Sequence, residues 1–287
     1  MYKPSDFLPD RQKQRRARLA VVALVALGIV KEPEWRAAAI ACVAAGLMLL
    51  GLFVSRSLRV RAPALDLSLF KAPSFRYANA ATLVFGAAFS AMFLGGVLFL
   101  TNVWGYDTAR AGLGMTPGPL IVMVVAPLAG RVAARMGHRV LLVPGGIIFG
   151  LGFLLRWAVT SNTPHYLTQW LPVVFSTGIG VGLVLPSLAA ASVHSLPGQR
   201  FAAGSAVNQS IRQIGSVLGI AVTVTLVGSA RGPEALAAFG PMFLALAFGG
   251  FLTALIAAPI DTRPARQQRT ATSQEPLSLR INNRRTT

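Results

Sequence analysis

Apolar residues gather in long uncharged blocks, and short polar or basic stretches separate these blocks. A helix of about 18 or more apolar residues is long enough to cross a bilayer. Blocks that approach or exceed this length occupy residues 37–54, 77–103, 111–130, 140–155, 157–199, 201–230 (interrupted only by Arg212) and 235–260. Lipid offers the backbone no hydrogen-bond partner, and the blocks do not alternate like barrel strands, so each is expected to be helical.

A shorter apolar run, residues 19–30, follows a basic cluster near the amino terminus. Secretory signal peptides share this arrangement. The sequence KEPEW that comes next lacks the small-x-small pattern of a cleavage site, which favours a short or truncated membrane helix. With this run included, the pattern predicts an all-α membrane protein, a polytopic bundle of about eight transmembrane helices.

The composition argues against a soluble globular domain. Hydrophobic residues make up 54% of the 287-residue chain and charged residues only 13%, whereas soluble domains carry about 25% charged residues. A single soluble core could not bury this much apolar surface, so the blocks need a membrane around them.

The strong positive charge, formally +18, at first suggests a nucleic-acid partner. If the amino terminus is cytoplasmic and the spans alternate, 21 of the 27 Lys and Arg residues face the cytoplasm. The outer side receives five, namely Lys31, Arg36, Arg110, Arg156 and Arg231. This asymmetry follows the positive-inside rule. We therefore predict a multi-pass protein of the cell membrane, with both termini cytoplasmic and no nucleic-acid partner.

Catalytic and metal-binding groups are scarce. All nine acidic residues fall outside the apolar blocks, and the single cysteine, Cys42, has no zinc-type or redox spacing. No nucleophile–base pair or phosphate-binding loop is present, so we expect neither an enzyme nor a cofactor or metal site. We expect His138 to be solvated in a basic loop. Tryptophans near span ends are expected to anchor at the interface: Trp104, Trp157 and Trp170.

Three stretches, 63–79, 111–140 and 178–222, carry motifs of a known family. The most specific is GSAVNQSIRQIGSVLGIA, which fits the pattern GSA-x-x-N-x-x-R-Q-x-G-x-x-x-G-x-A from Gly204 to Ala221. The chain resembles the fourteen-helix drug:proton antiporter branch of the major facilitator superfamily over roughly residues 15–260. Only the carboxy-terminal portion of that family is matched.

The loop GRVAARMGHR resembles the family's G-R-x-x-D-R-x-G-R-R motif. Matching positions are Gly130, Arg131, Arg135, Gly137 and Arg139. Ala134 stands where the family has an acidic residue, so the charge contacts that the resemblance implies for this loop are weakened. Glycine still permits a tight turn, and the arginines can contact helix carboxyl ends or lipid phosphates.

One helical face of the block 201–230 carries Gly204, Asn208, Arg212, Gly215 and Gly219, spaced by three or four residues. The G-x-x-x-G pairs Gly215/Gly219 and Gly146/Gly150 allow close helix packing. Two roles for Arg212 stay open, since it either lines a transport cavity or holds polar groups between helices. Candidates for the substrate cavity or coupling are Asn208, Arg212, Gln213 and Asn79.

The resemblance implies a division of the chain into five parts. These are a basic cytoplasmic segment at 1–18, two linker-type membrane helices at 19–56, a basic cytoplasmic loop at 57–76, a six-helix carboxy-terminal bundle at 77–260 and a disordered basic tail at 261–287.

The function implied is part of a proton-coupled secondary exporter of drugs or other amphipathic small molecules. Because spans of the amino-terminal half are missing, an amino-terminal half-transporter or a second copy is the expected partner, besides membrane lipid. The alternative is a non-transporting fragment or scaffold derived from such a transporter.

Overall fold

The computed structural model describes residues 45, 46, 48, 67–228, 235–260 and 262. The predicted segments 1–18 and 19–56 and the tail 261–287 lie almost wholly outside these residues, and they stay predictions. The described chain from residue 67 onward belongs to one compact unit, Leu65–Thr287.

This unit is built from helices in every described element. The long helices are α3 (Pro73–Asn102), α5 (Pro117–Met136), α6 (Arg139–Val159), α7 (Leu171–His194), α8 (Phe201–Val227) and α9 (Ala235–Ala257). Shorter elements are η2 (Leu67–Lys71), α4 (Thr108–Met115), η3 (Tyr166–Trp170) and η4 (Gly198–Arg200). Six of the described helical segments are long and apolar enough to cross a membrane, so the prediction of an all-α membrane bundle is confirmed.

The helix ends follow local chemistry. Helix α3 begins at Pro73, inside the stretch predicted as a loop, because proline suits a first helical turn. The Asp107 carboxylate caps α4 by accepting from the Arg110 backbone N–H at 2.7 Å. Helix α5 ends at Met136, and the next residue, Gly137, has a φ of 85° that suits glycine.

The uncharged block 157–199 is not one continuous helix. Its first three residues complete α6, and α7 begins only at Leu171. Between them lies the sequence SNTP, residues 161–164, which is rich in turn-forming residues. The boundary drawn at the charge of Arg156 was therefore wrong, because a single arginine does not end a helix.

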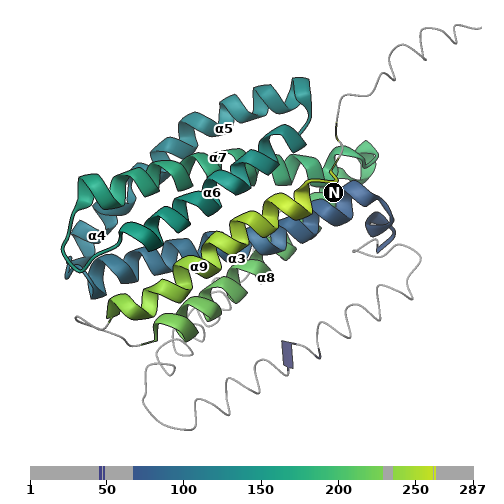
Figure 1. Cartoon of the computed structure of the whole chain (residues 1–287). Coiled ribbons are helices and arrows are strands. Elements are labelled where there is room, and N and C mark those ends of the chain that lie inside the picture. The colour runs from purple at the N-terminus through teal and green to yellow at the C-terminus, as the bar shows by residue number, and fades with distance from the viewer. Residues whose placement is uncertain (1–44, 47, 49–66, 229–234, 261, 263–287) are drawn as a thin grey trace, which may run out of the picture. The chain divides into compact units, whose positions relative to one another are not determined.

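The helices pack in a defined order. Helix α5 packs mainly on α7, and α8 packs mainly on α3, while α6 contacts both α7 and α9. Figure 1 shows α5 at one edge of the bundle and α8 at the other, with α7, α6, α9 and α3 between them. Large side chains fill the centre, among them Phe85, Phe99, Phe149 and Phe239, all fully buried.

The glycine pair of α8 lies where this helix crosses α3. A methyl group added at Gly215 would overlap the carbonyl oxygen of Leu83, and one added at Gly219 would overlap the carbonyl oxygen of Ala87. Such an approach is possible only without a side chain, so the pair determines how near the two backbones come. Gly204, on the same face, lies instead against the Leu196 side chain, which a methyl group there would displace.

The glycine pair of α6, Gly146 and Gly150, lies against α9. A methyl group added at Gly146 would lie 2.8 Å from the carbonyl oxygen of Gly250. One added at Gly150 would lie 3.0 Å from the carbonyl oxygen of Ala247 and equally near the ring of Phe251. Both glycines therefore face a backbone carbonyl of α9, which cannot move as a side chain can, and the approach is slightly closer at Gly146 than at Gly150.

Candidate functional site: an apolar pocket around a buried arginine

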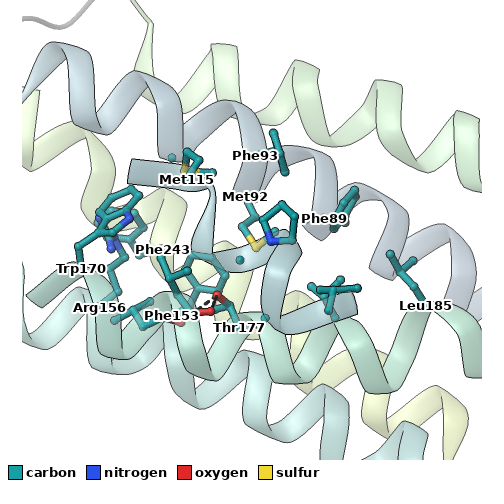
Figure 2. Close-up of a pocket in the computed structure, with 18 of the residues that line it drawn as sticks. Phe89, Met92, Phe93, Met115, Phe153, Arg156, Trp170, Thr177, Leu185 and Phe243 are labelled. Carbon is teal, nitrogen blue, oxygen red and sulfur yellow. Dashed lines mark hydrogen bonds between the residues drawn. The ribbon is translucent and has the colours of Figure 1, made fainter. Parts of the chain in front are cut away.

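A pocket of about 390 Å³ opens among α3, α5 and α7. Drug-sized ligand sites in proteins usually have volumes of about 300–1,000 Å³. Its lining is apolar and rich in flexible or aromatic side chains, including Phe89, Met92, Phe93, Met115, Met123, Phe153, Met242 and Phe243. Figure 2 shows several of these residues around the cavity, with Arg156 and Trp170 at one end.

Arg156 is the only charged residue among those that line the pocket. It lies in the last turn of α6, and only 4% of its surface is exposed. Its guanidinium carbon lies 3.7 Å from the ring centre of Trp170, 4.7 Å from Phe99 and 5.3 Å from Phe243. Within the described part of the chain, the only acidic residue is Asp107, whose carboxylate caps α4.

Segments far apart in sequence hold the aromatic rings around Arg156. The Trp170 indole N–H donates to the Gly114 carbonyl at 3.0 Å, and the Tyr166 hydroxyl donates to the same oxygen at 3.1 Å. The Trp170 ring also stacks on Phe99, with centroids 5.8 Å apart. The polar edge of Trp170 is therefore satisfied by α4, which leaves its face for the guanidinium.

This arrangement offsets part of the cost of burying a charge. A desolvated cation–π contact contributes about 2 kcal/mol or more, while a charge within a membrane helix costs at least about 2.5–3.5 kcal/mol. Arginine keeps its charge in proteins and carries five N–H donors. The pocket therefore combines an apolar body with one fixed positive end.

The sequence pattern indicated Arg156 only as one of the outer-side basic residues and not as a candidate site residue. One feature of the sequence could have identified it. Arg156 stands between Leu155 and Trp157 with no turn-forming residue beside it, as expected for a charge inside a helix. Trp170 and Trp104, expected at the interface, are buried at 2% and 7% exposure, whereas Trp157 is half exposed.

The four predicted cavity residues lie outside this pocket. Asn208 of α8 donates to Asn79 Oδ1 at 3.0 Å and to Thr82 Oγ1 at 2.9 Å, which joins α8 to α3. Arg212 is half-buried and donates to Gln209 Oε1 at 2.7 Å, while Gln213 is exposed. The structure thus brings Asn79 and Asn208 together, but neither lines the pocket around Arg156.

The predicted loop motif spans the end of α5 and the start of α6. Arg131, Arg135 and Arg139 are exposed there. Gly130 and Ala134 line a second cavity of about 220 Å³, together with His138, His194 and Thr262. Ala134, which stands where the resembled motif has an acidic residue, therefore faces this small cavity.

His138 is buried, so the expectation of a solvated side chain was wrong. Its backbone N–H donates to Thr262 Oγ1 at 2.8 Å, and its ring Nδ1 lies 2.9 Å from the same oxygen. The hydroxyl can donate to Nδ1 only if that nitrogen is unprotonated. Burial, and secondly the nearby His194 ring, lower the pKa of His138 below its ordinary value.

Comparison with known proteins places these features in context. The family model described as Major Facilitator Superfamily matches residues 17–220 and 80–285. The Methylenomycin A resistance protein of Streptomyces coelicolor is 31% identical over 243 residues, which cover 84% of this chain and 49% of that protein. The Cephamycin export protein CmcT of Amycolatopsis lactamdurans is 32% identical over 236 residues, with 79% and 48% covered.

The Probable actinorhodin transporter of Streptomyces coelicolor is 29% identical over 247 residues, covering 80% of this chain and 43% of that protein. The chain thus spans less than half the length of these relatives. The family match and the six apolar helices together identify a multi-pass membrane protein. The chain belongs to the major facilitator superfamily.

Proposed function

We propose that this chain is the carboxy-terminal part of a proton-coupled secondary exporter of drugs or other amphipathic small molecules in the cell membrane. The observation that carries the proposal is the apolar pocket with one charged end, within a chain of the major facilitator superfamily. Relatives named for resistance to or export of antibiotics support this choice of substrate class. Within the superfamily, the motif from Gly204 to Ala221 favours the fourteen-helix branch.

A second bundle is needed for such a function. Alternating access works by the movement of one bundle against another around a midplane site, and this chain spans less than half of its relatives. The described spans hold no Asp or Glu, although proton coupling usually depends on a membrane carboxylate. We infer that an amino-terminal half supplies this carboxylate, and that both termini of the present chain face the cytoplasm.

The exposed face of α8 carries a stripe of polar residues, which favours a cavity beside this helix. Ser205, Gln209 and Gln213 are exposed, and the half-buried Arg212 lies between them at helical spacing. Lipid would solvate such a polar stripe poorly. We therefore retain Arg212 and Gln213 as candidates for the cavity between the two halves, and assign Asn79 and Asn208 to the support of this face from the α3 side.

Drug accumulation in cells that lack their own efflux pumps tests the proposal. The chain alone, the chain with a six-helix amino-terminal half from a relative, and that pair with Arg212→Ala are compared. We expect the unaltered pair to lower accumulation, and the chain alone and the pair with Arg212→Ala to leave it high. A control pair with Arg110→Ala, which removes an exposed arginine, should lower accumulation as the unaltered pair does. If no combination lowers accumulation although the protein reaches the membrane, the chain is a non-transporting fragment or scaffold.

A further inference from the structure

We propose that the pocket around Arg156 binds amphipathic organic anions, with an aromatic or alicyclic body in the apolar cavity and a carboxylate-type group on the guanidinium. This assignment rests on the export function proposed above and specifies its substrate class. The pocket lies entirely within the described chain, so binding can be measured without transport.

The polar groups of the pocket point to an anion. Besides Arg156, its only lining residues with polar side chains are Thr177 and Trp170. The Thr177 hydroxyl donates to the Val173 carbonyl at 2.8 Å, and the Trp170 indole N–H donates to Gly114. The indole N–H can only donate, and the Thr177 hydroxyl bonds to its own helix rather than to the guanidinium, so the pocket-side donors of Arg156 have no acceptor among these side chains.

The aromatic rings cannot replace such an acceptor. Trp170, Phe99 and Phe243 contact the guanidinium through their faces, which attract the charge but do not accept its five N–H groups in line. A carboxylate matches the guanidinium fork with two parallel hydrogen bonds. In surroundings this apolar, an incoming cation would be repelled and a neutral amide would satisfy only part of the fork.

The lining also defines the rest of the ligand. Four methionines, Met92, Met115, Met123 and Met242, lie among the phenylalanines of the wall. Unbranched, polarizable side chains adapt to several shapes. A cavity of about 390 Å³ with such walls suits compact ring systems of varied outline and selects them by the charge at one end.

The test is equilibrium dialysis of the full chain in nanodiscs of zwitterionic lipid. The probes are 1-naphthaleneacetate and its uncharged isostere 1-naphthaleneacetamide. We expect the anion to bind about tenfold more tightly or better, the difference expected for a charged over a neutral hydrogen bond. Equal binding of the two probes to the unaltered chain overturns the proposal.

Variants test whether Arg156 causes the preference for the acetate over the amide. Arg156→Gln should lower the affinity for the acetate to that for the amide and leave the amide unchanged, whereas Arg110→Gln, which changes an exposed arginine outside the pocket, should alter neither. Persistence of the preference in Arg156→Gln overturns the proposal. If Arg156→Gln does not fold, Met123→Trp at the exposed edge of the pocket serves instead, and it should weaken both probes. Unchanged affinities in Met123→Trp place the site elsewhere and overturn the proposal.

An anionic lipid headgroup shares the chemistry of the acetate, so a second arm uses discs that contain phosphatidylglycerol. Unchanged affinity for the acetate supports a small-molecule site, and displacement by the lipid overturns the substrate assignment. The export proposal fails separately. A charge preference without lowered accumulation by the paired halves contradicts export alone, and export without a charge preference contradicts the anion site alone.

Discussion

The ring of Trp170 lies with its centre 3.7 Å from the guanidinium carbon of Arg156, and both side chains are almost completely buried. The two residues belong to different elements, η3 and α6, and the polar edge of the indole is turned toward α4. This contact joins three segments at one end of the bundle. It also determines where the single charge of the pocket stands.

Replacement of Trp170 should therefore destabilise the bundle. Trp170→Leu removes the cation–π contact and the hydrogen bond to Gly114, and we expect a loss of about 3–5 kcal/mol in unfolding free energy. Thermal unfolding in detergent measures the change. The matched control is Trp157→Leu, because Trp157 is half exposed in the same region. Equal losses in the two variants would contradict the proposed role of the contact.

Gly219 should tolerate no side chain. Gly219→Ala places a methyl group on the carbonyl oxygen of Ala87, so α8 and α3 must separate. We expect a loss of about 1–3 kcal/mol or more in unfolding free energy. Gly130→Ala is the control, since an added Cβ there meets no atom within 4 Å. That change should be neutral or stabilise α5 by up to about 1 kcal/mol, and a similar loss at both sites would refute the close crossing.

The amide of Asn208 should couple α8 to α3 energetically. Asn208→Ala leaves Asn79 and Thr82 without their shared donor, and the expected cost in unfolding free energy is about 1–3 kcal/mol. A double-mutant cycle with Asn79→Ala should give a coupling energy of at least about 0.5 kcal/mol. The exposed Gln213 provides the control, because Gln213→Ala should change stability by no more than about 0.5 kcal/mol. A coupling energy of zero would show that the two amides act independently.

His138 should make stability depend on pH. Its pKa is lowered in the folded protein from the ordinary 6.5, so the unfolded chain binds a proton more readily. The contribution of the neutral ring is complete above pH 6.5 and decreases as the pH falls through that value toward the lower pKa of the folded state. Protonation of Nδ1 also removes the acceptor for the Thr262 hydroxyl.

Unfolding midpoints measured between pH 8 and about pH 5 provide the test. His138→Gln should flatten the dependence, whereas His165→Gln, which changes an exposed histidine, should leave it as in the unaltered chain. A dependence that survives in His138→Gln would assign the effect to another group and contradict this role of His138.

Much of the fold followed from local features of the sequence. The apolar blocks identified the membrane helices because any helix in lipid must be long, predominantly apolar and internally hydrogen-bonded. The glycine spacing at Gly215 and Gly219 indicated a close crossing, since only a missing side chain permits one. The motif from Gly204 to Ala221 was sufficient to identify the family, which the comparison with known proteins then established.

The partner of each glycine pair, in contrast, was not predictable. Gly146 and Gly150 have the same spacing as Gly215 and Gly219, yet the first pair lies against α9 and the second against α3. A small-residue pattern states that a helix can be approached closely, but it contains no information on which helix approaches.

The surroundings of Arg156 could be learned only from the tertiary structure. Hydropathy treats an isolated charge between two blocks as a boundary, and it contains no information on which rings will surround that charge. The rings come from α3, η3 and α9, and Trp170 is oriented by α4, so no local pattern relates them. The same holds for Asn79 and Asn208, which are 129 residues apart.

The sequence by itself thus determined that the chain forms membrane helices and to which family they belong, because lipid imposes the same length and composition on every span. Only the tertiary structure decided which polar groups satisfy one another and which one faces a cavity. Asn208 finds its acceptors across α3, while Arg156 finds aromatic faces and an open pocket. The two side chains differ in their partners because packing between distant segments determines both which groups are buried and which can form hydrogen bonds.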